Sequence, residues 1–166
     1  TPLANKSLFN AIYLPFSENK IYNKIPIYII QGNISKKRRH YPLLIEIFKK
    51  TKEYKNFFKI KLIGNGNLPI NLNKYKDQII LKNNLNFIDY HKEFLDAYCI
   101  LPLITKKTHK DYYINKLTSS INYSKAYNLK TIIDKDLQEI YKLKNIEIFD
   151  NIKNKKNAFK KTLISF

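Results

Sequence analysis

The chain has 166 residues, which is enough for one domain with a sizeable apolar core. Hydrophobic residues make up 44% of it and aromatic residues 14%, a composition that excludes a disordered chain. Its 31 Lys and Arg against 13 Asp and Glu give a formal net charge of +18, which favours anionic partners: nucleic acid, an acidic membrane surface or phosphorylated small molecules.

The lone cysteine, Cys99, allows no disulfide within the chain, as expected in a reducing compartment. No stretch approaches the roughly twenty apolar residues that cross a bilayer, and the N-terminus lacks the layout of a signal peptide. We therefore expect a cytoplasmic protein without a transmembrane segment, or one in the host cytoplasm if the source is viral. Because the sequence starts at Thr1 and contains no Met, we also expect it to be a piece of a longer gene product.

Residues 1–24 are irregular, because Pro2, Pro15 and several Asn and Ser interrupt short apolar patches. We expect them to form a linker or the tail of a preceding domain. Residues 25–150 are expected to form the body of the domain, and the lysine-rich residues 151–166 a basic C-terminal helix.

The most informative stretch lies near the start of the body. The apolar run Ile27–Ile30 predicts a strand covered on both faces, as in a parallel sheet, and it stops at Gly32. A helix is predicted to begin at residues 40–42, because Pro42 suits a first helical turn. Between strand and helix lie Arg38 and Arg39, the only arginines of the chain.

Guanidinium groups grip phosphate in a bidentate way that ammonium groups cannot. Arg38 and Arg39 follow a strand and precede a helix, which is where an α/β sheet holds its ligand. The loop thus indicates a site for a phosphorylated ligand, and the alternative is a solvated basic turn.

The rest of the chain alternates between strand and helix patterns. A strand over Phe57–Ile63 ends at Gly64 and Gly66, so every glycine of the chain follows a strand end, where the backbone turns tightly or approaches a ligand. The further predicted elements are strands at 78–81 and 85–88, a helix capped by Asp89 and running through Ala97, a buried strand at 98–104, a loop at 105–112, a helix at 114–127, a strand at 131–133, a helix from 134 or 135 to 141, a strand at 146–149 and a helix at 151–164. This alternation predicts an α/β fold with a doubly wound, mainly parallel sheet flanked by helices.

The order of these pieces resembles the C-terminal, donor-binding domain of GT-B glycosyltransferases, from about residue 25 to 143. QGNISKKRRHYPLLIEIF, from Gln31, is similar to the family's first strand, basic loop and "LLIEAF" helix, and KIKLIGNGN, from Lys59, to its second strand and G-x-G turn. NLNFIDYHKEFLDAYCILPLI, from Asn84, is similar to the stretch that ends in "aDvfvlPS". KLTSSINYSKAYNLKTIID, from Lys116, resembles the helix and strand that carry the family's paired glutamates.

The paired glutamates themselves are missing. They would fall at about Asn115 and Tyr123, and neither residue is acidic. In the retaining enzymes the first glutamate lies near the sugar and the second contacts the ribose, so the resemblance does not support the usual retaining mechanism. A divergent subgroup begins this helix with Lys-x-Thr/Ser-Ser, to which Lys116–Ser120 is similar. Hydroxyls and free backbone N–H groups at a helix start, with one ammonium, can seat a diphosphate.

The resemblance implies that residues 25–150 form a Rossmann-like nucleotide-sugar-binding domain, with the sugar nucleotide as substrate, no cofactor and no metal. Arg38 or Arg39, with Lys116, would neutralise the diphosphate leaving group. The residues expected to bind the donor and its phosphates are Gly32, Arg38, Arg39, Gly64, Gly66, Lys116, Thr118, Ser119 and Ser120; those expected to bind base and ribose are Phe87, Tyr90 and Tyr123. His40, His91 and His109 are not spaced as metal ligands.

GT-B enzymes react in the cleft between two domains, so the resemblance also implies an N-terminal acceptor domain of the same protein. The acceptor could be a glycan, a protein or a lipid, and this chain alone is expected to be inactive in transfer. Two other functions fit the residues. The charge of +18 and the interleaved Tyr and Lys suggest a nucleic-acid-binding module, although Lys, Asn and Ile also rise together in A+T-rich coding sequence. The missing glutamates also permit a degenerate GT-B domain that acts as a scaffold or glycan binder.

Overall fold

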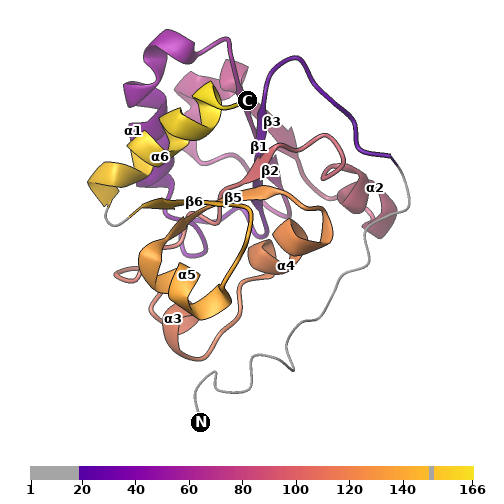
Figure 1. Cartoon of the computed structure of the whole chain (residues 1–166). Coiled ribbons are helices and arrows are strands. Elements are labelled where there is room, and N and C mark those ends of the chain that lie inside the picture. Colours follow the sequence, from indigo (N-terminus) through magenta and orange to yellow (C-terminus); the bar gives the residue numbers. More distant parts are fainter. Residues whose placement is uncertain (1–18, 150–151) are drawn as a thin grey trace.

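Six strands form one fully parallel sheet at the centre of the domain (Figure 1). The computed structural model describes residues 19–149 and 152–166, so the predictions for residues 1–18 lie outside the described residues. Each pair of neighbouring strands is parallel and the order is β3-β2-β1-β4-β5-β6. The strands are β1 (Ile27–Gln31), β2 (Lys59–Ile63), β3 (Ile79–Lys82), β4 (Cys99–Ile100), β5 (Lys130–Asp134) and β6 (Ile146–Phe149). This order confirms the doubly wound α/β fold that the sequence predicts.

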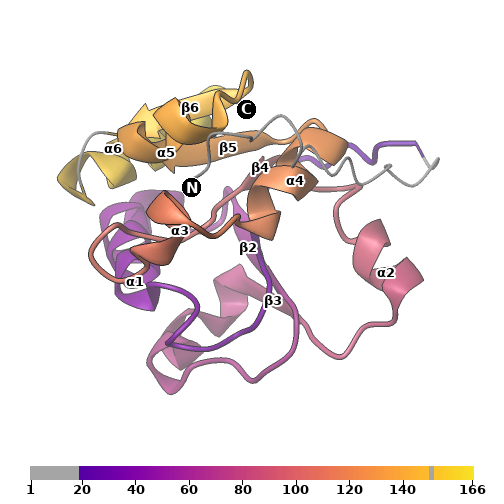
Figure 2. The same cartoon turned by 90° about the horizontal axis from the view of Figure 1, so that it is seen from below.

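Helices cover both faces of the sheet. They are α1 (Tyr41–Lys50), the 3-10 helices η2 (Lys52–Tyr54) and η3 (Ile70–Gln78), α2 (Phe87–Lys92), α3 (Asp111–Ile114), α4 (Ser119–Ala126), α5 (Lys135–Tyr141) and α6 (Ile152–Ile164). In Figure 1, α1 and α6 lie together on one side of the sheet and α4 and α5 on the other. Seen from below, in Figure 2, α2 lies at the opposite end of the molecule from α1.

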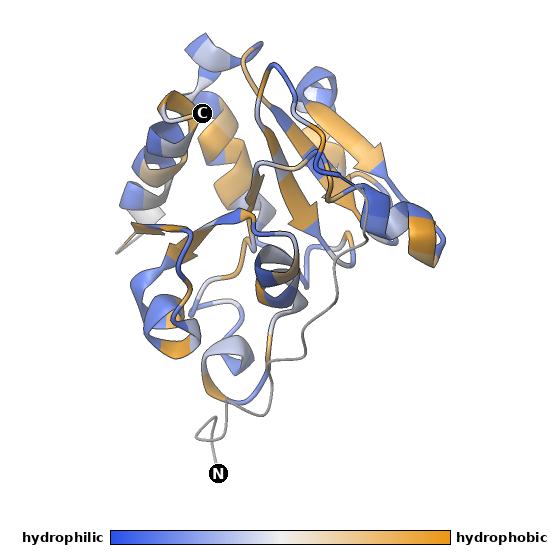
Figure 3. Cartoon of the chain, turned by 45° about the vertical axis from the view of Figure 1, so that its right-hand side comes forward, coloured by the Kyte–Doolittle hydropathy of each residue, from blue (hydrophilic) through white to orange (hydrophobic). Residues whose placement is uncertain are grey.

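Alternate residues of β1 show how the strand serves both faces. Tyr28 and Ile30 belong to the core shared with α1 and α6, whereas Ile29 packs with Phe94 and Tyr123 on the α4 side. All five residues of β1 are buried, as an apolar run in a parallel sheet requires. Figure 3 shows the central strands coloured as hydrophobic, while the helices carry blue segments.

The side chain of Lys61 is a buried cation next to the core. Lys61, in β2, is only 2% exposed, and its Nζ lies 2.8 Å from a carboxylate oxygen of Glu93 and 2.5 Å from one of Asp96. A buried ammonium is tolerated when it is paired in this way. Burial raises the pKa of Glu93, but hydrogen bonds from Lys61 and Lys82 outweigh that effect and bring it below its ordinary value.

Several predicted boundaries are wrong around α2. No strand forms at 85–88, because the Asn86 side chain accepts a hydrogen bond from the Asp89 N–H (2.9 Å) and starts a helix instead. Asp89 is therefore not the cap; its carboxylate accepts from Asn86 Nδ2 at 2.7 Å. The helix also ends at Lys92 rather than at Ala97.

Two further elements differ from the prediction. The buried run at 98–104 pairs as a strand only over Cys99–Ile100, and Leu103 has a φ of +48°, which is incompatible with an extended strand. The helix predicted over 114–127 forms only over Ser119–Ala126, as α4. Helix α3 begins at Asp111, inside the predicted loop at 105–112, and Thr118 between the two helices is extended. In the part of the chain that the structure describes, no helix combines the length and apolarity needed to cross a membrane.

Candidate functional site

The order in which strands are added to the sheet reverses between β1 and β4, which makes this the topological switch point of the described sheet. From β1 the chain continues to β2 on one side, and from β4 it continues to β5 on the other. The loops after the two strands therefore diverge, and in such sheets ligands bind in the crevice beyond the carboxyl ends. Here the loops are residues 32–40 after β1 and residues 101–118 after β4.

Two of the predicted glycines pack the loop after β2 closely against the loop after β1. Gly32 has a φ of +106°, and a Cβ on it would lie 2.5 Å from Nη2 of Arg39. Gly64 has a φ of +143°, and a Cβ there would clash with the carbonyl oxygen of Gly32. Gly66 approaches the Ile34 backbone in the same way. Close backbone approach explains Gly64 and Gly66, and positive φ with the nearby Arg39 side chain explains Gly32. Their contact with a ligand stays a prediction.

The two arginines differ sharply in environment. Arg39 is 5% exposed, donates a hydrogen bond from Nη2 to the Gln31 carbonyl and another from Nη1 to the Arg38 carbonyl (2.7 Å). Burial lowers the pKa of its guanidinium, and the phenols of Tyr112 and Tyr41 oppose that shift. Arg38 is exposed. Arg39 thus shapes the loop, while Arg38 presents its charge to solvent.

Gln31 joins the end of β1 to the start of α4. Its Oε1 accepts a hydrogen bond from Ser120 Oγ (3.0 Å), and Ser119 Oγ lies 3.1 Å from its Nε2. Because the Gln31 carbonyl also accepts from Arg39, the arginine loop and the serine-bearing helix start lie at the same edge of the sheet. Sequence analysis missed Gln31, although a polar residue that ends an otherwise apolar strand is a usable signal.

The hydroxyl-bearing tract is only partly accessible. Ser120 is fully buried, Thr118 is 3% exposed and its N–H donates to Tyr141 Oη (3.2 Å), while Ser119 is half-buried. Lys116 is exposed and forms an ion pair with Asp111 at 2.8 Å. Among these residues, Ser119 and Lys116 are the ones with side chains accessible to a ligand at the edge.

A hollow of about 520 Å³ opens at this edge. Its walls come from the loop after β1 and from the longer loop after β4. The residues that line it are Lys37, Arg38, Lys107, Thr108, His109, Lys110, Asp111, Tyr112 and Lys116. The hollow is therefore cationic and combines two of the predicted phosphate-binding residues, Arg38 and Lys116.

Hydrogen bonds fix the two walls. The His40 N–H donates to the Leu103 carbonyl (2.9 Å), which ties the two loops together. Within the second loop, the His109 N–H donates to the Thr105 carbonyl (2.8 Å), and Thr108 Oγ1 lies 2.7 Å from His109 Nδ1. Burial, with the positive charges of Arg39 and His40, lowers the pKa of His109. The imidazole is thus a neutral wall residue at pH 7.

The residues predicted to bind base and ribose lie apart from this hollow. Phe87 is 71% exposed on α2, whereas Tyr123 is 8% exposed and stacks on Phe94 with ring centroids 4.5 Å apart. Tyr90 and Tyr123 do meet, at 5.8 Å between centroids. His91 is buried, with Nδ1 2.5 Å from Tyr127 Oη.

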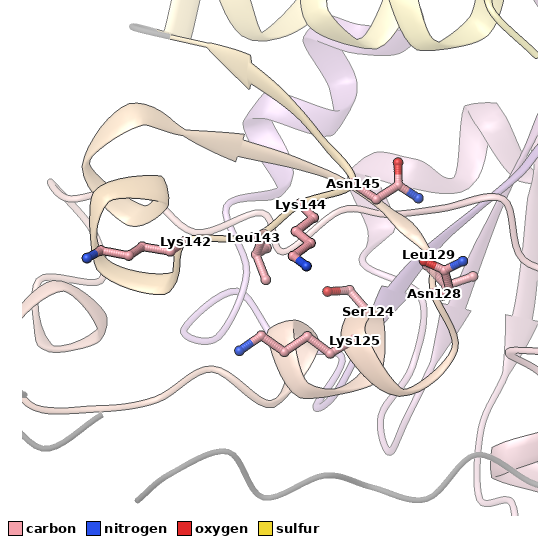
Figure 4. Close-up of a pocket in the computed structure, with 8 residues that line it drawn as sticks. All are labelled: Ser124, Lys125, Asn128, Leu129, Lys142, Leu143, Lys144 and Asn145. Atoms are coloured by element: carbon pink, nitrogen blue, oxygen red, sulfur yellow. The ribbon is translucent and has the colours of Figure 1, made fainter. Parts of the chain in front are cut away.

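A second hollow, of about 360 Å³, lies at the opposite edge, before the starts of β5 and β6 (Figure 4). Figure 4 shows Lys144 reaching toward Ser124 and Lys142 pointing away from it. Lys125 and Lys142 stand at the carboxyl ends of α4 and α5. Cations are favoured there by the helix dipole, so these lysines need no ligand to explain them.

The described residues hold no group of three or more His, Cys, Asp or Glu placed to bind a metal ion. Cys99 is fully buried, and burial raises its pKa well above the ordinary value. A thiol in this state is a core residue rather than a nucleophile.

The strand order, the parallel pairing of all strands and the crevice between β1 and β4 define the chain as a Rossmann-like α/β domain. Among solved structures, it is similar to the C-terminal domain of a group 1 family glycosyl transferase, LpcC, from Francisella tularensis. The TM-score is 0.57 and 13% of residues are identical, over 95% of this chain and 87% of that one. This likeness confirms the expected fold, that of the C-terminal domain of a GT-B glycosyltransferase. No protein-family model and no curated protein sequence matches the chain.

Proposed function

We propose that this domain binds the diphosphate of a nucleotide sugar and is the donor-binding half of a glycosyltransferase. The observation that carries the proposal is the cationic hollow at the topological switch point between β1 and β4, next to the start of α4. A sheet of this kind binds phosphate-bearing ligands at that position, and a group 1 glycosyl transferase domain shares the fold.

Two side chains carry the proposed phosphate contacts. Arg38 lies in one wall of the hollow and Lys116 in the other, so a diphosphate between them is held from both sides. Ser119, at the first position of α4, adds a hydroxyl and a first-turn N–H group that lacks an intrahelical partner. Charge neutralisation of this kind stabilises a departing nucleotide diphosphate, which is the electrostatic task of glycosyl transfer.

Arg39 and Gln31 position the proposed ligand-binding residues and do not contact the ligand in this proposal. Arg39 holds the loop through two carbonyls, and Gln31 fixes the orientation of Ser119 and Ser120. Most of the acceptor site belongs to a second domain in this proposal, so the chain alone binds a donor without transferring its sugar.

Calorimetry tests the proposal directly. The chain is titrated with UDP-, GDP- and ADP-sugars, and one of them is expected to bind. Arg38→Ala and Lys116→Ala are each expected to weaken it about tenfold or more, because a hydrogen bond to a charged group contributes about 1.5 to 3 kcal/mol.

Lys50→Ala is the matched control. Lys50 is an exposed lysine at the end of α1, at the edge of the sheet away from the hollow, so its removal changes the net charge equally. The proposal fails if no nucleotide sugar binds, or if Lys50→Ala weakens binding as much as Arg38→Ala does. Binding of single-stranded DNA or RNA with a steep salt dependence, and without preference for any nucleotide sugar, would favour the nucleic-acid alternative instead.

A further inference from the structure

The hollow carries more positive charge than a nucleotide sugar neutralises. Five cationic side chains line it, and Asp111 is the one carboxylate among the described lining residues. The diphosphate of a nucleotide sugar brings about two negative charges, one for each phosphate. Four net positive charges therefore face two negative ones, and the excess is left for another group. The cationic residues are Lys37, Arg38, Lys107, Lys110 and Lys116.

Two of the five cations, Lys107 and Lys110, lie on the loop after β4. Lys106 on that loop pairs with Asp136, outside the hollow, at 2.8 Å. Lys107 and Lys110 line the hollow and form no ion pair within the described part of the chain. Lys106 is thus paired with a carboxylate, whereas Lys107 and Lys110 line the cavity.

The loop is also held in shape before any ligand binds. Thr105 Oγ1 lies 2.6 Å from Thr108 Oγ1, and Thr108 Oγ1 lies 2.7 Å from His109 Nδ1. His109 itself is buried and anchors the loop between Lys107 and Lys110. A fixed loop places its ammonium groups without an ordering cost on binding.

We propose that the acceptor of this transferase is anionic, and that Lys107 and Lys110 bind its phosphate or carboxylate while Arg38 and Lys116 hold the donor. The inference rests on the proposed donor site. An uncharged acceptor would leave the charges of Lys107 and Lys110, on one wall of the hollow, without a counter-charge, and like charges repel. An acidic acceptor replaces that repulsion with charge-assisted hydrogen bonds.

The test measures whether the chain, when saturated with nucleotide sugar, binds a second anion. The nucleotide sugar that binds best is kept at saturation, and a hexose 6-phosphate and a hexuronate are titrated in turn, with the neutral hexose as the matched probe. We expect one of the two acidic sugars to bind and the neutral hexose not to bind. The double variant Lys107→Ala with Lys110→Ala is expected to weaken the acidic sugar at least about tenfold, and the nucleotide sugar less than about threefold.

The outcomes separate this inference from the proposed function. If the nucleotide sugar binds but neither acidic sugar does, or if each binds only when the nucleotide is absent, the anionic acceptor is refuted and the donor site stands. If Lys49→Ala with Lys50→Ala, an equal charge loss on α1, weakens the acidic sugar as much as the Lys107 and Lys110 variant, the binding is diffuse and the inference is refuted. If no nucleotide sugar binds at all, the proposed function fails first.

Discussion

The adjacent arginines Arg38 and Arg39 should affect different properties of the protein. Arg39 is 5% exposed and gives two hydrogen bonds to the carbonyls of Gln31 and Arg38. Arg39→Ala removes both donors and leaves a void beside Gly32. Each hydrogen bond from a charged group contributes about 1.5 to 3 kcal/mol, and the cost of burying the guanidinium offsets part of the sum. We therefore expect a loss of about 2 to 3 kcal/mol in the free energy of unfolding.

For a chain of this length, such a loss corresponds to a fall in Tm of about 4 to 12 °C. Urea unfolding followed by circular dichroism gives the free energy, and calorimetric melting gives Tm. Arg38→Ala is the matched control: Arg38 is exposed, so its removal should change the free energy of unfolding by less than about 0.5 kcal/mol. The same variant should weaken nucleotide-sugar binding, as proposed above.

Arg39→Lys should fall between the two, because an ammonium cannot form the same fork of hydrogen bonds to two carbonyls. The reasoning is refuted if Arg39→Ala has the same Tm as the wild-type chain and no longer binds the nucleotide sugar. Arg39 would then be a ligand-binding group rather than the residue that holds the loop.

Three other changes test the structure. Gly64→Ala should lower the free energy of unfolding by about 2 kcal/mol or more, because φ is +143° and a Cβ would clash with the Gly32 carbonyl; unchanged urea unfolding would contradict this. Tyr28→Phe should cost about 1 kcal/mol in the same assay, because it removes the buried hydrogen bond to Thr162 Oγ1 (2.9 Å), and a stability equal to wild type would show that this bond contributes nothing. Lowering the pH from 7 to 5 should destabilise the chain, because burial lowers the pKa of His91 and His109 from 6.5, so the folded state binds fewer protons than the unfolded state. The stability from neutral imidazoles is fully present above pH 6.5 and is lost as the pH falls; His109→Gln should flatten the slope of stability against pH, and an unchanged slope would rule out His109 as a source.

The sheet could be predicted because each strand shows as a short apolar pattern in its own stretch of sequence. Runs such as Ile27–Ile30 and Ile146–Phe149 are apolar at every or every second position, and helix patterns separate them. Parallel strands connected through helices leave few topologies, so alternation alone indicates a doubly wound fold. The location of the candidate site was predicted from the same pattern, since that prediction depends only on where strands end.

The boundaries around α2 could not be predicted in this way. The run at 85–88 has the composition of a strand, but one hydrogen bond from the Asp89 N–H to the Asn86 side chain makes it a helix start. Short segments are decided by such single contacts and by the space left for them. Likewise, the separation of α3 from α4 depends on Thr118 meeting Tyr141, 23 residues away.

The sequence by itself determined that two guanidiniums and a hydroxyl tract lie at strand ends, because residue type and periodicity are local properties. Only the tertiary structure decided which of them are accessible at the surface. It buried Arg39 against the carbonyl of Gln31, left Arg38 in the hollow, and placed Gln31 between β1 and α4. Burial is set by what packs around a side chain, and those neighbours come from distant parts of the chain.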